Sequence, residues 1–301
     1  MLGLIFIESP LTDTKMSSSY YYMTKLYILT QKSMPAFCPD DKGLIAAFKD
    51  VGIEATAKIW DEWELKFNVN VLMRTPWDYA QNREKFESLL QKIESSQSHC
   101  INSLDVIRWN MNKKYLVELS KQGVDVIPTK VFLNFNAKEQ KNLLNEGPVV
   151  CKPLVGAGGI DTFLVEKNED LRNTDVLFGR DILVQPFISD ILDNGELSFI
   201  YFDHQFSHAI LKKAKSGEFR VQDDYGGTVS PYEPTKDEVC QVNSIIKATG
   251  RQFSYVRVDV VKLKAKLLLM EFEAIEPELF FRFSKDSMYK YCKAVKQSMC
   301  V

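Results

Sequence analysis

Three carboxylates lie on two apolar segments near the C-terminus of the chain. Asp259 occupies the middle of residues 257–261, and Glu271 and Glu273 end the apolar stretch of residues 267–273. The β-branched and apolar neighbours predict buried strands, and residues two apart on a strand share one face. Carboxylates in so apolar a setting resist ionisation unless a cation neutralises them, so the pattern predicts oxygen ligands for Mg2+. An exposed face of an antiparallel sheet, on which acids alternate with apolar residues, is the competing interpretation.

The composition is typical of a soluble globular protein with a sizeable core. The chain has 301 residues, 45% of them hydrophobic, and its 38 basic and 40 acidic residues leave a net charge of -2. This charge gives no electrostatic reason to bind nucleic acid or an anionic membrane, so a small-molecule partner fits better. The six cysteines lack CxxC or His-Cys spacing, which argues against a zinc site and a disulfide framework. The cysteines are therefore expected to be reduced thiols in a cytoplasmic protein. No apolar stretch approaches the roughly 20 residues that cross a bilayer, so we expect a soluble protein.

The chain is expected to divide into four parts. Residues 1–7 are apolar but short and lack a basic region, and serines and tyrosines follow before Met23, which argues against a signal peptide. The expected parts are an extension or leader over residues 1–22, a Rossmann-like domain over 23–109, a central unit over 110–189 and a strand-rich unit over 190–301.

Strand and helix patterns alternate over residues 23–109, which predicts a parallel α/β sheet. Strands are expected at residues 26–29, 54–59 and 70–73, and helices at 44–51 and 84–93. Ligands on such sheets bind beyond the carboxyl ends of the strands. Arg74, Thr75, Trp77 and Asp78 follow the third strand and are therefore candidates for a substrate pocket, with a capped turn and a packed tryptophan as an equal alternative.

The central unit combines a lysine with a glycine-rich loop. Lys152 ends an apolar strand, and Gly156, Gly158 and Gly159 follow it. Backbone N–H groups in such a loop can approach phosphate oxygens closely. Taken alone, the loop favours a plain turn between strands, because the Walker signature is absent. The other elements expected here are helices at residues 113–122 and 137–145 and strands at 126–132 and 149–152.

Further residues change that interpretation. Lys113 opens a helix upstream, Gln185 and Phe187 end an apolar strand downstream, and Arg220 shortly precedes Gly226. Together they offer cations for phosphates and a hinge for an adenine ring. In the last unit, helices are expected at residues 236–248 and 286–296. The lysines around Lys212 are expected on a solvated hairpin, with a substrate-facing basic edge as the alternative.

The order of these features resembles the ATP-grasp superfamily of carboxylate–amine ligases, in the branch near glutathione synthetase and the ribosomal-protein glutamate ligases. The resemblance runs from about Met23 onward. Three phrases are most similar to D-cycloserine synthetase-like proteins: Arg108-Trp109-Asn110 with Lys113, residues 217–222 with Tyr225-Gly226-Gly227, and Ile275-Glu276-Pro277. The resemblance implies an α/β (α+β) fold, in which a Rossmann-like N-terminal domain precedes two α+β subdomains that clamp ATP.

The resemblance also implies roles for the residues of an ATP site. These roles are phosphate contacts by Lys113 and Lys152, a mobile cover formed by Gly156, Gly158 and Gly159, an adenine border formed by Gln185 and Phe187, and a ribose contact by Glu196. A surface acid before a strand is the alternative for Glu196. Arg220 would steady the transferring phosphoryl group, and Arg257 would contact substrate or phosphate.

Metal and substrate contacts complete the implied site. The implied metal ligands are Asp259, Glu271 and Glu273, which would hold two Mg2+ ions, with Mn2+ as an alternative. Many relatives carry asparagine where this chain has Glu273, and the extra negative charge should tighten metal binding or shift its geometry. Glu276 and the segment from Arg74 to Asp78 are the candidate substrate contacts.

The implied chemistry is ATP-dependent amide formation. A carboxylate attacks the γ-phosphorus of Mg-ATP to give an acyl phosphate and ADP, and an amine then displaces phosphate. Phosphoryl transfer needs mainly positioning and charge neutralisation, which suits lysines, an arginine and metal-bound carboxylates. The implied partners are a small amino-acid-like carboxylate and an amine, and a homodimer is common in the family. A cycloligase that joins both groups of one molecule, a small-molecule kinase and a non-catalytic ATP-binding protein are the alternatives.

Overall fold

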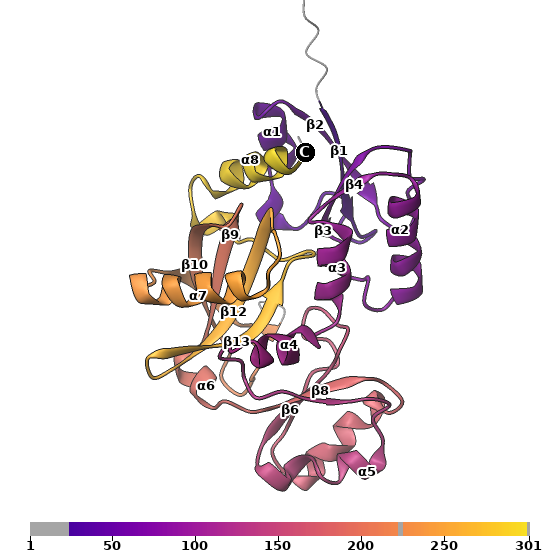
Figure 1. Ribbon diagram of the computed structural model, residues 1–301. Coiled ribbons are helices and arrows are strands. Elements are labelled where there is room, and N and C mark those ends of the chain that lie inside the picture. Colours follow the sequence, from indigo (N-terminus) through magenta and orange to yellow (C-terminus); the bar gives the residue numbers. More distant parts are fainter. Residues whose placement is uncertain (1–23, 222–224, 300–301) are drawn as a thin grey trace, which may run out of the picture.

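The computed structural model describes residues 24–221 and 225–299. The chain forms three sheets, and Figure 1 shows the C-terminal sheet between the N-terminal part and the central part. The expectation of a leader over residues 1–22 lies outside the described residues. Among the described residues, no helix combines the length and the apolar character needed to cross a membrane.

The N-terminal part is a parallel sheet with strand order β2-β1-β3-β4. Apolar strands separated by amphipathic helices produce this arrangement, as the sequence predicted, whereas β4 and α3 were not foreseen. The strands are β1 (Thr24–Thr30), β2 (Ile53–Ile59), β3 (Asn70–Thr75) and β4 (His99–Ile101), and the helices are α1 (Leu44–Asp50), α2 (Arg83–Ser95), α3 (Leu104–Met111) and the 3-10 helix η1 (Pro39–Asp41).

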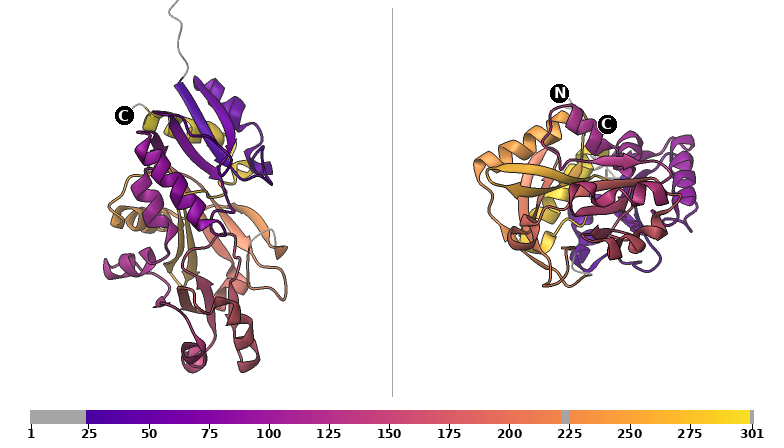
Figure 2. Two further views of the ribbon diagram at one scale, coloured as in Figure 1. Left: turned by 90° about the vertical axis from the view of Figure 1, so that its right-hand side faces the viewer. Right: turned by 90° about the horizontal axis from the view of Figure 1, so that it is seen from below.

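The central part is an antiparallel sheet with strand order β5-β8-β6-β7. Its elements are α4 (Tyr115–Lys121), β5 (Lys130–Phe132), α5 (Ala137–Gln140), η2 (Leu143–Glu146), β6 (Val149–Pro153), β7 (Phe163–Val165), η3 (Asn168–Leu177) and β8 (Ile182–Pro186). Strand β6 carries Lys152 toward the glycine-rich loop. The left view of Figure 2 shows this part at the end of the molecule opposite to the N-terminal sheet.

Two expected elements of the central part are shorter than predicted. The strand expected over residues 126–132 is confined to β5, because Pro128 has no N–H to donate to a neighbouring strand. Val126 instead forms an isolated parallel bridge with Leu269 of the C-terminal sheet. The helix expected over residues 137–145 ends with α5 and gives way to η2.

The C-terminal part is an antiparallel sheet with strand order β11-β10-β9-β12-β13. Its elements are α6 (Asp190–Asn194), β9 (Glu196–Phe202), β10 (Gln205–Lys213), β11 (Thr228–Tyr232), α7 (Lys236–Ala248), β12 (Tyr255–Leu263), β13 (Lys266–Glu273), η5 (Phe281–Phe283) and α8 (Ser287–Met299). Helix α7 covers the predicted residues because Thr235 and Glu238 cap its start reciprocally.

The two faces of the C-terminal sheet have different surroundings. Val256, Val258 and Val260 alternate along β12 and pack in one core cluster with residues of α4 and α7. Arg257 and Asp259 occupy the intervening positions and therefore face the other side. Helix α8 returns to the N-terminal part and packs beside α1 (Figure 1). Helix α8 also contacts β9 and β12, so it holds the N-terminal part against the C-terminal sheet.

Candidate active site

A cleft of about 1300 Å³ is lined by residues from all three parts of the fold. Most of the residues that the sequence predicted for a site lie on its wall. They are Trp77, Asp78, Lys113, Lys152, Gly156, Gly158, Gly159, Gln185, Phe187, Glu196, Arg220, Arg257, Glu271, Glu273 and Glu276. Residues that are up to 199 positions apart in the sequence therefore face one volume.

Arg74 and Thr75, predicted for the substrate pocket, lie beneath the cleft wall. The Arg74 side chain is fully buried and pairs with the equally buried Asp41, with Nη2 2.7 Å from Oδ1. Its Nη1 donates to the carbonyl oxygen of Pro277 at 2.5 Å. The hydroxyl groups of Thr75 and Thr30 lie 2.6 Å apart. The expectation that Arg74 and Thr75 face substrate is therefore corrected: Arg74 joins the N-terminal sheet to the segment behind the cleft, and Thr75 pairs with Thr30 within that sheet.

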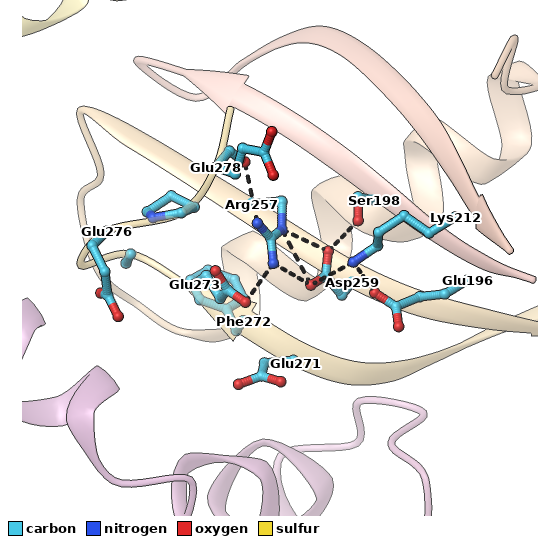
Figure 3. A network of polar contacts seen from close by, with 12 residues as sticks. Glu196, Ser198, Lys212, Arg257, Asp259, Glu271, Phe272, Glu273, Glu276 and Glu278 are labelled. Carbon is cyan, nitrogen blue, oxygen red and sulfur yellow. Dashed lines mark hydrogen bonds and ion pairs between the residues drawn. The ribbon is translucent and has the colours of Figure 1, made fainter. Parts of the chain in front are cut away.

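A row of charged residues crosses the cleft-facing side of the C-terminal sheet. Strand pairing places Lys212 opposite Glu196, Ser198 opposite Asp259, Asp259 opposite Glu271, and Arg257 opposite Glu273. Figure 3 shows these side chains converging, with Arg257, Asp259 and Lys212 joined by continuous contacts. The alternation of side chains along four adjacent strands thus builds the row.

Asp259 is buried within the row, with 2% of its surface exposed. Its Oδ1 accepts hydrogen bonds from Ser198 at 2.5 Å and from Arg257 Nε at 3.0 Å, and its Oδ2 lies 2.9 Å from Arg257 Nη2. Burial alone would raise the pKa of this carboxyl, but Arg257 and Lys212 outweigh it and hold the pKa at about 2. Asp259 is therefore an ionised carboxylate, and protein donors occupy both of its oxygens.

Lys212 is buried, in contrast to the solvated hairpin expected from the sequence. Its ammonium group pairs with Glu196 and lies 3.4 Å from Oδ2 of Asp259. The two acids favour its charged form, and its pKa is raised even though burial opposes this. Glu196 is correspondingly a buried partner of Lys212, with 2% of its surface exposed, and the alternative of a surface acid is wrong.

Two lysines of the central part reach across to β13. Lys113 Nζ lies 3.0 Å from Oε1 of Glu271 and donates to the carbonyl oxygen of Gly156 at 2.6 Å. Lys152 Nζ lies 3.9 Å from Oε2 of the same glutamate. Burial lowers the pKa of Lys152, and the negative charge of Glu271 opposes this shift. Both lysines therefore lie at the cleft beside the glycine-rich loop, where they could bind an anionic ligand.

Arg220 is held by a neighbouring residue that the sequence analysis did not single out. Glu218 accepts from Arg220 Nε at 3.0 Å and from Nη2 at 2.8 Å, and the backbone N–H groups of Phe219 and Arg220 donate to the same carboxylate. The hydrogen bonds from Arg220 are the largest cause that lowers the pKa of Glu218, to about 2. The Arg220 guanidinium also lies 3.5 Å from the ring centre of Tyr225. Its orientation toward the cleft is thus fixed.

Both residues of the expected adenine border donate a hydrogen bond within the protein. Gln185 Nε2 donates to Thr129 at 3.0 Å, and the Phe187 N–H donates to the carbonyl oxygen of Pro148 at 2.9 Å. The Phe187 ring stands edge-on to Phe219 at 6.5 Å between ring centres. Phe187 and Phe219 therefore contribute aromatic surface to the cleft wall next to the end of β8.

The three predicted metal ligands, Asp259, Glu271 and Glu273, do not form a preformed metal site. Within residues 24–221 and 225–299, no group of three or more His, Cys, Asp and Glu side chains is arranged to hold a metal ion. Glu271 and Glu273 line the cleft, and their oxygen donors suit Mg2+, but each already has a cationic neighbour, as Arg257 also pairs with Glu273. A metal ion bound here would compete with Lys113, Lys152 and Arg257 for these carboxylates.

Comparison with known proteins decides the family. The RimK-like ATP-grasp domain matches residues 111–286, which is more than half of the chain, and the N-terminal domain of D-cycloserine synthetase DcsG matches residues 26–102. The chain belongs to the RimK-like ATP-grasp family. It is an ATP-grasp ligase, and it uses ATP and a divalent metal ion as ligases of this family do.

Individual relatives agree with this family. The cycloserine biosynthesis protein DcsG of Streptomyces lavendulae is 25% identical over 286 residues, which cover 85% of this chain and 92% of that protein. A probable alpha-L-glutamate ligase of Vibrio atlanticus (strain LGP32) is 27% identical over 61% of this chain and 62% of its own length. The crystal structure of D-cycloserine synthetase DcsG has a TM-score of 0.81 at 23% identity and covers 91% of this chain and 99% of its own. The predicted ATP-grasp fold is thereby confirmed.

Proposed function

We propose that this ATP-grasp ligase activates the carboxylate of a small amino-acid-like substrate as an acyl phosphate and joins it to an amine. The observation that carries the proposal is the pairing of Lys113 and Lys152 with Glu271 in the cleft wall. Two lysines beside a glycine-rich loop match the charge of a polyphosphate, and the cleft-facing glutamates match that of a metal ion. On nucleotide binding, the phosphates would replace Glu271 as the partner of the two lysines. A metal ion would replace the lysines as the partner of Glu271.

The residues of the chain have distinct tasks in this proposal. Lys113 and Lys152 hold the phosphates, with Gly156, Gly158 and Gly159 supplying a flexible cover. Gln185 and Phe187 border the adenine ring, and Glu196 with Lys212 forms the wall nearest the ribose. Arg220, already oriented by Glu218, approaches the phosphoryl group that moves.

The metal site of the proposal centres on β13. Glu271 and Glu273 are the ligands that the cleft exposes, and Asp259 would join them only after Arg257 shifts. A bound divalent ion supplies charge neutralisation for the transferring phosphoryl group. The proposal includes two Mg2+ ions, and Mn2+ can replace Mg2+ in binding titrations.

Arg257 and the N-terminal wall are assigned to the substrate. Arg257 bridges Asp259 and Glu273 and lines the cleft, so it can turn from Glu273 toward a substrate carboxylate or phosphate. Trp77, Asp78 and Glu276 lie at this end of the cleft. Charge neutralisation by Arg257 favours the developing acyl phosphate, and no covalent link to the protein is required.

An intramolecular reaction is the second candidate. The match of residues 26–102 to the N-terminal domain of D-cycloserine synthetase DcsG favours it, because this part supplies the substrate wall. In that case the acid and the amine belong to one molecule, and the product is a ring.

ADP release from Mg-ATP tests the proposal. Amino acids and short peptides are supplied singly and in pairs, and the products are identified by mass spectrometry. ADP release that requires both an acid and an amine and yields a condensed product supports intermolecular ligation. Release with one substrate and loss of water indicates cyclisation. A phosphorylated product that persists in the presence of amines indicates a kinase and contradicts ligation.

A further inference from the structure

Five consecutive backbone carbonyl groups behind the cleft each accept a hydrogen bond from a side chain. They belong to residues 274–278, directly after β13. The bonds are Asn102 to Ala274 at 2.8 Å, Tyr255 to Ile275 at 2.8 Å, Trp77 to Glu276 at 2.9 Å, Arg74 to Pro277 at 2.5 Å and Arg257 to Glu278 at 3.1 Å. Side-chain donors from the N-terminal part and from β12 therefore fix this segment on both sides.

The donors themselves are held firmly. Arg74, Asn102 and Tyr255 are each at most 2% exposed. Arg74 is anchored by Asp41, and Arg257 by Asp259. The bonds from Arg74 and Asn102 join the N-terminal part to the segment that follows the C-terminal sheet. A backbone fixed by such buried partners also presents its side chains in one position, as binding sites require.

Glu276 is the glutamate of this segment that forms no ion pair with another described residue. Its side chain lines the cleft, and the opposite charge that acts on it is that of Lys113, which already pairs with Glu271. Figure 3 shows it turned away from the contacts around Arg257. Glu278, two residues later, pairs with Arg282 at 2.5 Å. The segment thus holds one paired and one unpaired glutamate.

The surroundings of Glu276 disfavour an isolated negative charge. Burial, and next the nearby charge of Glu273, raise the pKa of Glu276 to about 8. Partial burial without an ion-pair partner disfavours the charged form of this carboxyl group, and a bound cation would stabilise that form. The position at the substrate end of the cleft makes the substrate the natural source of this cation.

We infer that Glu276 binds the ammonium group of the substrate and thereby selects molecules that carry both an amine and a carboxylate. The inference rests on the proposed function, since the carboxylate must lie toward Arg257 and the phosphate-binding lysines. The amine end would then meet Glu276, and the rigid backbone of residues 274–278 would set the distance between the two ends.

Matched ligand pairs test this role without turnover. The full chain is loaded with Mg2+ and the non-hydrolysable analogue AMP-PNP, and binding is measured by calorimetry. The probes are the common amino acids in both chiral forms, each compared with the carboxylic acid that lacks its amino group. We expect at least one amino acid to bind about tenfold or more tightly than its matched acid, as a charge-assisted contact allows.

The variant Glu276→Gln should abolish that preference and leave the AMP-PNP affinity unchanged. It keeps the size of the side chain and breaks no ion pair, so the fold should tolerate it. Glu278→Gln is the matched control and should keep the preference, because Arg282 already neutralises Glu278. Three results would overturn the inference alone. They are equal binding of amino acids and matched acids to the wild type, absence of amino-acid binding, and an unchanged preference in Glu276→Gln. Failure of the wild type to bind AMP-PNP overturns the proposed function as well.

Discussion

Arg257 and Asp259 form a fork on one face of β12. Arg257 Nε lies 3.0 Å and 3.2 Å from the two oxygens of Asp259, and Nη2 lies 2.9 Å from Oδ2. Residues two apart on a strand point the same way, so the local geometry enforces the contact. The fork holds Arg257 over the cleft, and it also makes Asp259 the counter-charge of a buried cation.

Asp259→Asn should therefore reduce both stability and turnover. The substitution leaves Arg257 and Lys212 buried without their shared carboxylate, which should lower the free energy of unfolding by about 3 kcal/mol. Urea unfolding in the presence of EDTA measures this loss separately from any metal effect. Asp193→Asn, on the exposed side of α6, is the control and should change stability by no more than about 0.5 kcal/mol. Equal unfolding midpoints and slopes for Asp259→Asn and the wild type would contradict the structural role.

Glu271→Gln should act mainly on the metal. Glu271 is partly exposed in the cleft and neutralises Lys113 and Lys152, so loss of its charge weakens a candidate ligand while the backbone remains supported. We expect the affinity for Mn2+ in the presence of AMP-PNP to fall at least about tenfold, since even indirect partners of metal ions have effects of this size. Electron paramagnetic resonance of free Mn2+ gives the affinity. Exposed Glu233→Gln is the control, and an unchanged affinity in Glu271→Gln would remove this residue from the metal site.

The sequence predicted the features that depend on local patterns. Helix α7 was expected at residues 236–248, where it is found, and its start is explained by the reciprocal cap of Thr235 and Glu238. The shared face of Glu271 and Glu273 follows from strand periodicity. The cleft-lining positions of Lys113 and Lys152 were expected from the family resemblance and not from periodicity alone.

Features that depend on partners far away in the chain were missed. Lys212 and Lys213 look alike in the sequence, yet Lys212 is buried because β10 places it opposite Glu196. Arg74 ends a strand, where both a pocket residue and a buried residue are common. Arg74 is buried because it pairs with Asp41, which lies 33 residues earlier in the chain.

Arg74→Lys should destabilise the protein although it keeps the charge. A lysine cannot reproduce the two bonds to Asp41 together with the bond to the Pro277 carbonyl, because it lacks the planar fork of arginine. We expect a loss of about 3 kcal/mol in the free energy of unfolding, measured by urea denaturation. Arg83→Lys, on the exposed surface of α2, should remain within about 0.5 kcal/mol of the wild type. A stability of Arg74→Lys that matches this control would mean that the charge alone suffices.

Glu218→Gln should slow phosphoryl transfer through Arg220. Gln keeps one acceptor but loses the charge that holds the guanidinium at two points. We expect kcat for ADP release to fall about tenfold, with a smaller change in the KM for ATP, because Arg220 acts on the group in transfer. The reaction is assayed with the substrate identified by the ADP-release screen. Exposed Glu166→Gln serves as the control.

The pH dependence separates this positioning role from a proton-transfer role. The folded pKa of Glu218 is about 2, below the ordinary value of 4.5, so its pair with Arg220 is complete above about pH 4.5 and is lost only as the pH falls toward 2. The ratio of wild-type to Glu218→Gln kcat should therefore stay constant between about pH 6 and about pH 8. A ratio that changes across this range would show that Glu218 exchanges a proton during turnover, and a ratio near one would show that Arg220 keeps its position without this partner.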